Sequence, residues 1–132
     1  MIPIIFAGGS GNRIKEESNN KPKCMIRLNN KPIPSYILYN LINNNIKNVI
    51  IAVGYKRNVI IENFESYFYG LKINYATNNH NHKTGNMYSL SIFYNQYNKL
   101  LRNKDVIILE SDIIFSPSAI KTVIKTKMLF FQ

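Results

Sequence analysis

The sequence predicts an α/β protein with a mostly parallel sheet that carries helices on both of its faces. Two observations lead to this fold class. Short apolar runs of strand length alternate along the chain with longer segments in which apolar residues recur at helical spacing. The first run, Ile2–Ala7, passes directly into Gly8 and Gly9, as a buried parallel strand does before a tight turn. Because parallel neighbours need helical crossovers, this alternation implies a layered architecture of sheet and helices.

Four segments are expected to be strands. Ile2–Ala7 and Asn48–Val53 are nearly continuous apolar runs, and the second is closed by Gly54. Such runs are typical of parallel strands that are buried on both faces. Leu71–Ala76 is the third expected strand and Asp105–Leu109 is the fourth.

Helices are expected between and after these strands. Pro34–Asn43 has apolar residues near helical spacing and a proline at its start, where a helix tolerates one. Val59–Phe68 is interpreted as an amphipathic helix, and Asn86–Leu101 as a helix rich in Tyr and Leu. Ser116 is predicted to cap the last helix, with Pro117 at its first position.

Two polar segments follow strands that should end at the same edge of the sheet. The glycine loop follows the first strand, and Asp112 follows the fourth. Ligands of such sheets bind beyond the carboxyl ends of the strands. We therefore expect the loop and Asp112 to lie on one rim.

Composition narrows the class of protein. A chain of 132 residues with 45% hydrophobic content fits one folded domain or a part of one. The single cysteine, Cys24, rules out an internal disulfide framework and a cysteine-cluster metal site. No apolar run reaches the roughly 18 residues that span a bilayer. The apolar start lacks a basic region, so it resembles a strand more than a signal peptide, and a cytoplasmic location is expected.

The net charge of +10 favours anionic partners such as nucleotides or nucleic acid. The lysines are spread along the chain, however, which is typical of a solvated surface. A nucleic-acid-binding protein remains an alternative that rests on charge alone, because no base-reading motif is present. We expect no nucleic-acid partner.

The glycine loop, Ala7–Arg13, and the segment Lys21–Lys23 have the chemistry of a phosphate-binding site. Glycines allow backbone N–H groups to approach phosphate oxygens closely. Arg13 can donate two hydrogen bonds to a phosphate, and Lys23 adds a positive charge. The loop lacks the Gly-Lys-Ser/Thr of a P-loop and the third glycine of a dinucleotide fingerprint. By itself it could also be an ordinary strand-to-helix turn.

Together these residues resemble the signature of the nucleotidyltransferase family, which includes sugar-1-phosphate nucleotidyltransferases and phosphocholine cytidylyltransferases. The resemblance implies the family's Rossmann-like (GT-A-like) fold, in which the loop wraps a nucleoside triphosphate. It implies that Arg13 and Lys23 are catalytic. It also implies that the loop residues bind the nucleotide, namely Ala7, Gly8, Gly9, Ser10 and Gly11. The segment Asn30–Ile33 resembles the family's turn before its first long helix.

Asp112 lies in the segment Glu110–Phe115, where an apolar strand is followed by Ser-Asp and an apolar pair. A carboxylate at a strand end can hold Mg²⁺, which prefers oxygen ligands and bridges nucleotide phosphates. The alternative is a turn residue before a helix. The resemblance identifies Asp112 with the family's metal-binding aspartate, and Glu110 is interpreted as structural.

A third group of residues resembles the part of cytidylyltransferases that helps to hold the base and ribose. It contains the Asn-x-Tyr-Ser-Leu sequence of Asn86–Leu90, and Asn78 precedes it. The amide and hydroxyl groups of Asn78, Asn86 and Ser89 can both donate and accept hydrogen bonds. Asn86 could equally cap a helix. His80 and His82 in the same polar loop are expected to be exposed and not to bind metal.

The resemblance implies Mg²⁺-dependent attack by an acceptor oxygen on the α-phosphorus of a nucleoside triphosphate, with release of pyrophosphate. CTP is favoured as the donor and phosphocholine or a related phosphonate as the acceptor. The alternatives are a sugar-1-phosphate nucleotidyltransferase that uses UTP or dTTP, and a truncated, non-catalytic nucleotide-binding relative. The resemblance covers nearly the whole chain but only the first half of the family's domain. We therefore expect this chain to bind nucleotide, with weak turnover or none.

Overall fold

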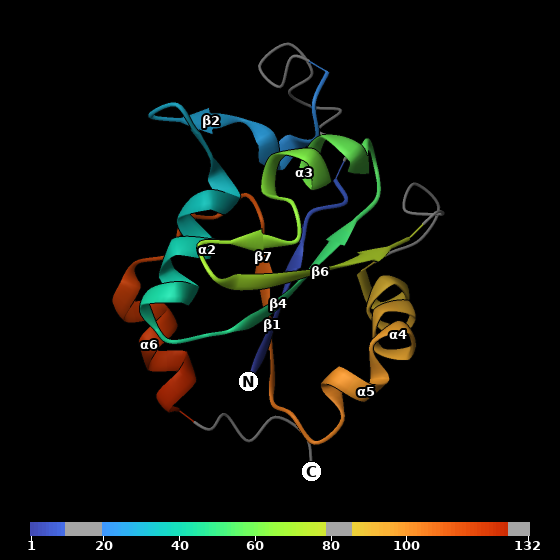
Figure 1. Ribbon diagram of the computed structural model, residues 1–132, viewed down its shortest axis with the longest axis vertical. Coiled ribbons are helices and arrows are strands. Elements are labelled where there is room, and N and C mark those ends of the chain that lie inside the picture. The colour runs from blue at the N-terminus through green and yellow to red at the C-terminus, as the bar shows by residue number, and fades with distance from the viewer. Residues whose placement is uncertain (10–19, 79–85, 127–132) are drawn as a thin grey trace.

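A five-stranded sheet forms the centre of the computed structural model, which describes residues 1–9, 20–78 and 86–126 (Figure 1). Its order is β5-β6-β4-β1-β7. The strands are β1 (Ile2–Phe6), β4 (Asn48–Val53), β5 (Tyr67–Phe68), β6 (Leu71–Thr77) and β7 (Val106–Glu110). Every neighbouring pair in the sheet is parallel except β5 and β6. The predicted mostly parallel sheet is therefore confirmed, and all four expected strands are present.

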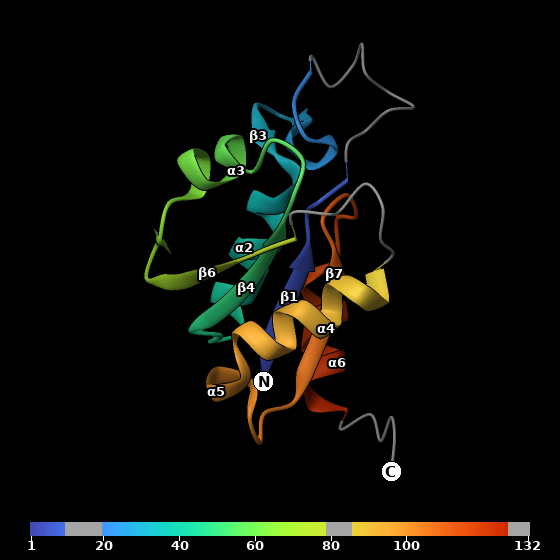
Figure 2. The same ribbon diagram turned by 90° about the vertical axis from the view of Figure 1, so that its right-hand side faces the viewer.

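Helices cover both faces of this sheet (Figures 1 and 2). They are α2 (Ile33–Asn43), α3 (Arg57–Phe64), α4 (Asn86–Gln96), α5 (Asn98–Leu101) and α6 (Pro117–Lys125). One apolar core lies between the sheet and α2, α3 and α6, and a second lies between the sheet and α4 and α5. Ile4 and Ile5 are both fully buried, but they belong to different cores. This is why the central strands are apolar at successive positions.

The predicted helix Val59–Phe68 is too long, because α3 ends at Phe64. Glu65 adopts a left-handed backbone conformation, with a φ of 56°, and the chain then forms the short strand β5. Phe68 nevertheless packs against the same core as Phe64, with their ring centroids 5.9 Å apart. The helical pattern of apolar residues continues to Phe68 because this residue, although it lies in the β5–β6 hairpin, packs against the same core as the helix.

The predicted helix Asn86–Leu101 is divided at Tyr97, where α4 gives way to α5. The Tyr97 hydroxyl donates a hydrogen bond to the carbonyl oxygen of Tyr75 in β6. Phe93 and Leu101 still belong to one core on either side of this break. The apolar residues therefore keep helical spacing across the break between α4 and α5, which is why the sequence predicted one helix.

Two smaller elements complete the described fold. The antiparallel pair β2 (Arg27–Leu28) and β3 (Lys31–Pro32) is joined by Asn29 and Asn30, both with positive φ. Asparagine is common at such hairpin positions, so the turn lies slightly earlier than the resemblance suggested. Ser116 caps α6 as predicted, because its Oγ accepts a hydrogen bond from the Ala119 N–H at 3.2 Å. Within the described ranges, no helix is both long and apolar enough to cross a membrane.

Strand β7 is an edge of the sheet in the part of the chain that the structure describes. It pairs with β1 on one side, and Val106 and Ile108 are 40% and 47% exposed. An apolar groove of about 830 Å³ lies between β7 and α6, and its lining includes Val123 and Ile124. Exposed apolar edge strands pair readily with other chains.

We therefore expect Ile108→Lys to reduce the aggregation of this chain. A charged side chain at the centre of the edge should disfavour pairing between copies, while the half-exposed site can accept it with little loss of stability. Light scattering at increasing protein concentration would measure the effect, and circular dichroism would verify the fold. Equal aggregation of the variant and the wild type would argue against β7 as the contact.

Candidate nucleotide-binding site

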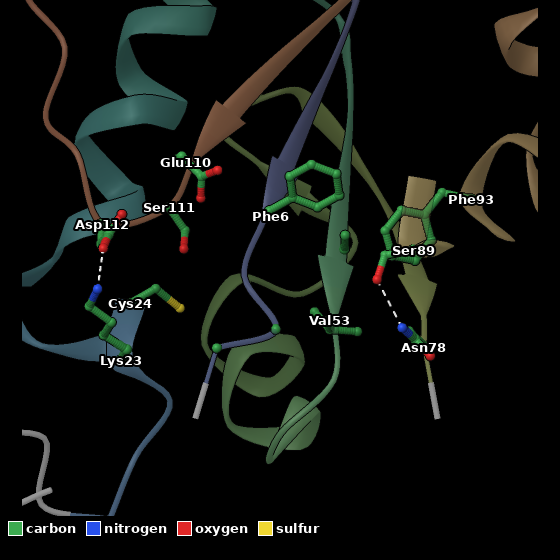
Figure 3. A pocket seen from close by; sticks show the side chains of 13 residues that line it. Phe6, Lys23, Cys24, Val53, Asn78, Ser89, Phe93, Glu110, Ser111 and Asp112 are labelled. Carbon is green, nitrogen blue, oxygen red and sulfur yellow. Dashed lines mark hydrogen bonds and ion pairs between the residues drawn. The ribbon is translucent and has the colours of Figure 1, made fainter. Parts of the chain in front are cut away.

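A cavity of about 220 Å³ opens at the carboxyl ends of the central strands (Figure 3). Six residues predicted from the sequence line it: Gly8, Gly9, Lys23, Asn78, Ser89 and Asp112. They come from the loop after β1, from the segment after Pro22, from the end of β6, from α4 and from the end of β7. The expected meeting of the glycine loop and Asp112 on one rim is thus observed.

The glycine loop enters the cavity directly from β1. The Ala7 N–H donates a hydrogen bond to the Ala52 carbonyl oxygen at 2.8 Å, which fixes the start of the loop against β4. Ala7 itself is buried and is not among the lining residues. Gly8 and Gly9 line the cavity, and a Cβ atom at Gly9 would meet nothing within 4 Å. Glycine is therefore not required by crowding at Gly9.

Three predicted residues of this loop, Ser10, Gly11 and Arg13, lie outside the described residues. The same holds for His80 and His82 and for the side chain of Asn86. Their predicted roles stay predictions.

The central feature of the cavity is an ion pair between Lys23 and Asp112. Lys23 Nζ donates to Asp112 Oδ2 at 2.5 Å, as the dashed line in Figure 3 marks. The two side chains are 46% and 31% exposed. The Lys23 N–H also donates to the Gly9 carbonyl oxygen at 3.4 Å. Lys23 thus connects the glycine loop to a carboxylate 89 positions further along the chain.

Buried neighbours place each member of this pair. Lys23 begins a short 3-10 helix, η2 (Lys23–Met25), whose other residues, Cys24 and Met25, are buried in the core. Burial of these two side chains leaves Lys23 facing the cavity. On the other side, Asn40 Nδ2 donates to the Phe115 carbonyl oxygen at 2.8 Å and ties the segment after Asp112 to α2.

Asn78 and Ser89 lie on the side of the cavity opposite the ion pair in Figure 3. Asn78 is 2% exposed, and its Nδ2 donates to Ser89 Oγ at 2.9 Å. The Asn78 N–H donates to the Val53 carbonyl oxygen at 3.2 Å. The first bond joins the end of β6 to α4 and the second joins it to β4, so Asn78 holds together three elements beside the cavity.

Several lining residues were not predicted from the sequence. Glu110, interpreted as structural, lines the cavity next to Ser111 and Asp112. Phe6 and Phe93 form an apolar wall, with their ring centroids 6.0 Å apart. The position of Glu110 at a strand end was a usable signal. Nothing in the sequence indicated that Phe93, in the middle of a helix, would face the same cavity.

Cys24 also lines the cavity, but its chemistry is that of a core residue. Burial raises the pKa of its thiol from 9.0 to about 12, and hydrogen bonding to Ser111 opposes the shift only in part. The thiol is therefore protonated at neutral pH. Its contribution to stability is present below pH 9 and is lost as the pH rises toward about 12.

We expect Cys24 to react with a disulfide reagent such as DTNB at least ~100-fold more slowly in the folded chain than in guanidinium chloride, because the thiolate is the reactive form. Absorbance at pH 8 would follow the reaction. The chain has a single cysteine, so the signal has one source. A fast reaction of the folded chain would contradict the burial of this thiol.

The cavity has oxygen donors that suit a magnesium ion bound together with nucleotide. Asp112 and Glu110 contribute carboxylates from the same strand end. Among the described residues, no group of three or more His, Cys, Asp or Glu side chains is placed to hold a metal. Mg²⁺ commonly takes one or two carboxylates and completes its shell with phosphate oxygens and water. The residues present fit that mode of binding.

Comparison with known proteins agrees with the fold. The family model for nucleotidyl transferases matches residues 2–128. The D-glycero-alpha-D-manno-heptose 1-phosphate guanylyltransferase of Campylobacter jejuni is 43% identical over 76 residues, which cover 58% of this chain and 34% of that protein. The CMP-5'-(3-aminopropyl)phosphonate synthase of Streptomyces rubellomurinus is 27% identical over 118 residues, or 89% of this chain and 18% of that protein.

Among solved structures, the CTP:phosphocholine cytidylyltransferase of Streptococcus pneumoniae superposes with a TM-score of 0.63 and 25% identity. The match covers 84% of this chain and 45% of that one. The match thus spans about a third of one curated relative, less than a fifth of the other and just under half of this structure. The chain belongs to the nucleotidyl transferase family.

Proposed function

We propose that this chain forms the nucleotide-binding part of a nucleotidyltransferase. The enzyme would transfer a nucleoside monophosphate from a nucleoside triphosphate to a small phosphorylated acceptor. The observation that carries the proposal is the meeting of Gly8, Gly9, Lys23 and Asp112 at one cavity beyond the carboxyl ends of the strands. Backbone N–H groups, an ammonium group and a carboxylate are the parts that a nucleotide triphosphate and its metal require.

In the proposed reaction an anionic oxygen of the acceptor attacks the α-phosphorus, and the bond to pyrophosphate breaks. The attacking oxygen is already deprotonated, so the chain needs no general base. Lys23 would stabilise negative charge on the phosphates, and the family resemblance adds Arg13 to this role. Asp112 would hold Mg²⁺, which supplies positive charge to the phosphate oxygens. The contribution of these residues is positioning and charge stabilisation.

CTP is the nucleotide that we favour, with phosphocholine or a related phosphonate as acceptor. Two observations support this choice: the Asn-x-Tyr-Ser-Leu segment that begins at Asn86, and the cytidylyltransferases among the relatives. The second candidate is a sugar-1-phosphate nucleotidyltransferase, favoured by the 43% identity to the heptose 1-phosphate guanylyltransferase. A non-catalytic nucleotide-binding relative is the third. A cytoplasmic location and the absence of a nucleic-acid partner stay predictions.

Calorimetric titration with CTP, UTP, GTP and ATP, each with and without Mg²⁺, tests the proposal. Selective, Mg²⁺-dependent binding of CTP would support a cytidylyltransferase, and preference for GTP or UTP would support the second candidate. Binding of no nucleotide would overturn the proposal for this chain. We expect weak pyrophosphate release or none from this chain with CTP, Mg²⁺ and phosphocholine, and full turnover would rule out the non-catalytic candidate.

A further inference from the structure

The ion pair in the cavity uses the carboxylate that we assign to magnesium. Among the described residues that line the cavity, the charged side chains are Lys23, Glu110 and Asp112. One ammonium group therefore shares the cavity lining with two carboxylates, and it is bonded to one of them at 2.5 Å. This bond neutralises part of the negative charge that would attract a divalent ion.

The ammonium group and a divalent ion compete for Asp112. Mg²⁺ binds carboxylate oxygens at about 2.1 Å. An ion on Asp112 Oδ2 would therefore lie at most ~4.6 Å from Lys23 Nζ in its present position. Two positive groups at that separation repel each other, and solvent screens this repulsion only in part because the two side chains are partly buried. Binding of the ion requires the lysine side chain to move.

A bound nucleotide would offer the Lys23 side chain an alternative partner to Asp112. Its N–H donates to the Gly9 carbonyl oxygen, so its backbone lies beside the glycine loop where phosphates are expected. The side chain is 46% exposed and is carried on a four-carbon stem. Phosphate oxygens at the loop would offer the ammonium group a more highly charged partner than Asp112.

We propose that Lys23 is an internal counter-ion of Asp112, which keeps metal affinity low until nucleotide phosphates draw the ammonium group away. Nucleotide and metal then bind cooperatively at this site. The inference rests on the proposed function, because it assigns the glycine loop to phosphates and Asp112 to Mg²⁺. This coupling is reciprocal: nucleotide should raise the affinity for metal by the same factor by which metal raises the affinity for nucleotide.

The test measures binding of Mn²⁺ alone, by electron paramagnetic resonance, with no nucleotide present. Lys23→Met is expected to bind Mn²⁺ about three- to tenfold more tightly than the wild type, the range that loss of a partly exposed ion pair and its repulsion would produce. Lys23→Arg, which keeps the charge, should bind as weakly as the wild type. Lys21→Met is the matched control, because it removes a lysine two positions away from the pair.

Two further arms make the result specific. Adding Asp112→Asn to Lys23→Met should remove the gained Mn²⁺ affinity. In EDTA, Asp112→Asn should bind CTP more tightly than Glu110→Gln, although each removes one carboxylate from the cavity. Thermal melting would verify that all variants fold.

Equal or weaker Mn²⁺ binding by Lys23→Met would overturn the inference, as would a gain that persists without Asp112. Failure of the wild-type chain to bind any nucleotide would count against the proposed function instead, and the Mn²⁺ comparison would still decide the role of Lys23.

Discussion

Replacement of Asp112 by asparagine is expected to weaken CTP binding in Mg²⁺ by about 10- to 100-fold, equivalent to ~1.4–3 kcal/mol. Asparagine preserves the size of the side chain but removes the charge that would hold the ion between protein and phosphates. Calorimetric titration of both proteins with CTP in Mg²⁺ would measure the difference. We expect a large effect because the ion would connect Asp112 to the nucleotide phosphates, so that losing the ion loses every contact made through it.

Two controls would show that the loss of CTP affinity comes from the metal. In EDTA the variant should bind CTP at least as tightly as the wild type, because the loss concerns only the metal. Glu110→Gln, at the same strand end, should cause a smaller loss in Mg²⁺. Unchanged Mg²⁺-dependent affinity in Asp112→Asn would place the metal elsewhere.

Ile5→Ala is expected to lower the free energy of unfolding by about 3–5 kcal/mol. Ile5 lies in β1, an interior strand between β4 and β7, is fully buried and belongs to the core under α2, α3 and α6. The truncation removes apolar contacts and leaves a cavity that this central position cannot close. Such a loss is a large part of the roughly 5–15 kcal/mol that is typical of small domains. Urea denaturation followed by circular dichroism would measure it.

Ile108→Ala is the matched control. It makes the same chemical change in the edge strand β7, where the side chain is 47% exposed. We expect this substitution to cost no more than ~1 kcal/mol. Similar losses for the two variants would mean that β1 and β7 do not differ in burial as the structure shows.

The strands and their parallel arrangement could be predicted from the sequence because burial on both faces imposes a continuous apolar run. Asn48–Val53 was predicted with its observed bounds for this reason. The ends of α3 and α4 could not be predicted. Phe68 packs against one core from a hairpin, and Leu101 is buried in the other core from a separate short helix, so periodicity alone does not reveal the breaks.

The candidate site likewise has features that the sequence predicted and features that only the tertiary structure revealed. The order of the strands was enough to predict that the glycine loop and Asp112 share one rim, because the carboxyl ends of parallel strands lie at the same edge of the sheet. The roles predicted for the loop, Lys23 and Asp112 rested in addition on the family resemblance. Only the tertiary structure decided that Lys23 and Asp112 bond to each other and that Glu110 and Phe93 share their cavity. These contacts join segments far apart in the chain, and they depend on how the helices and strands pack, which no local pattern of residues specifies.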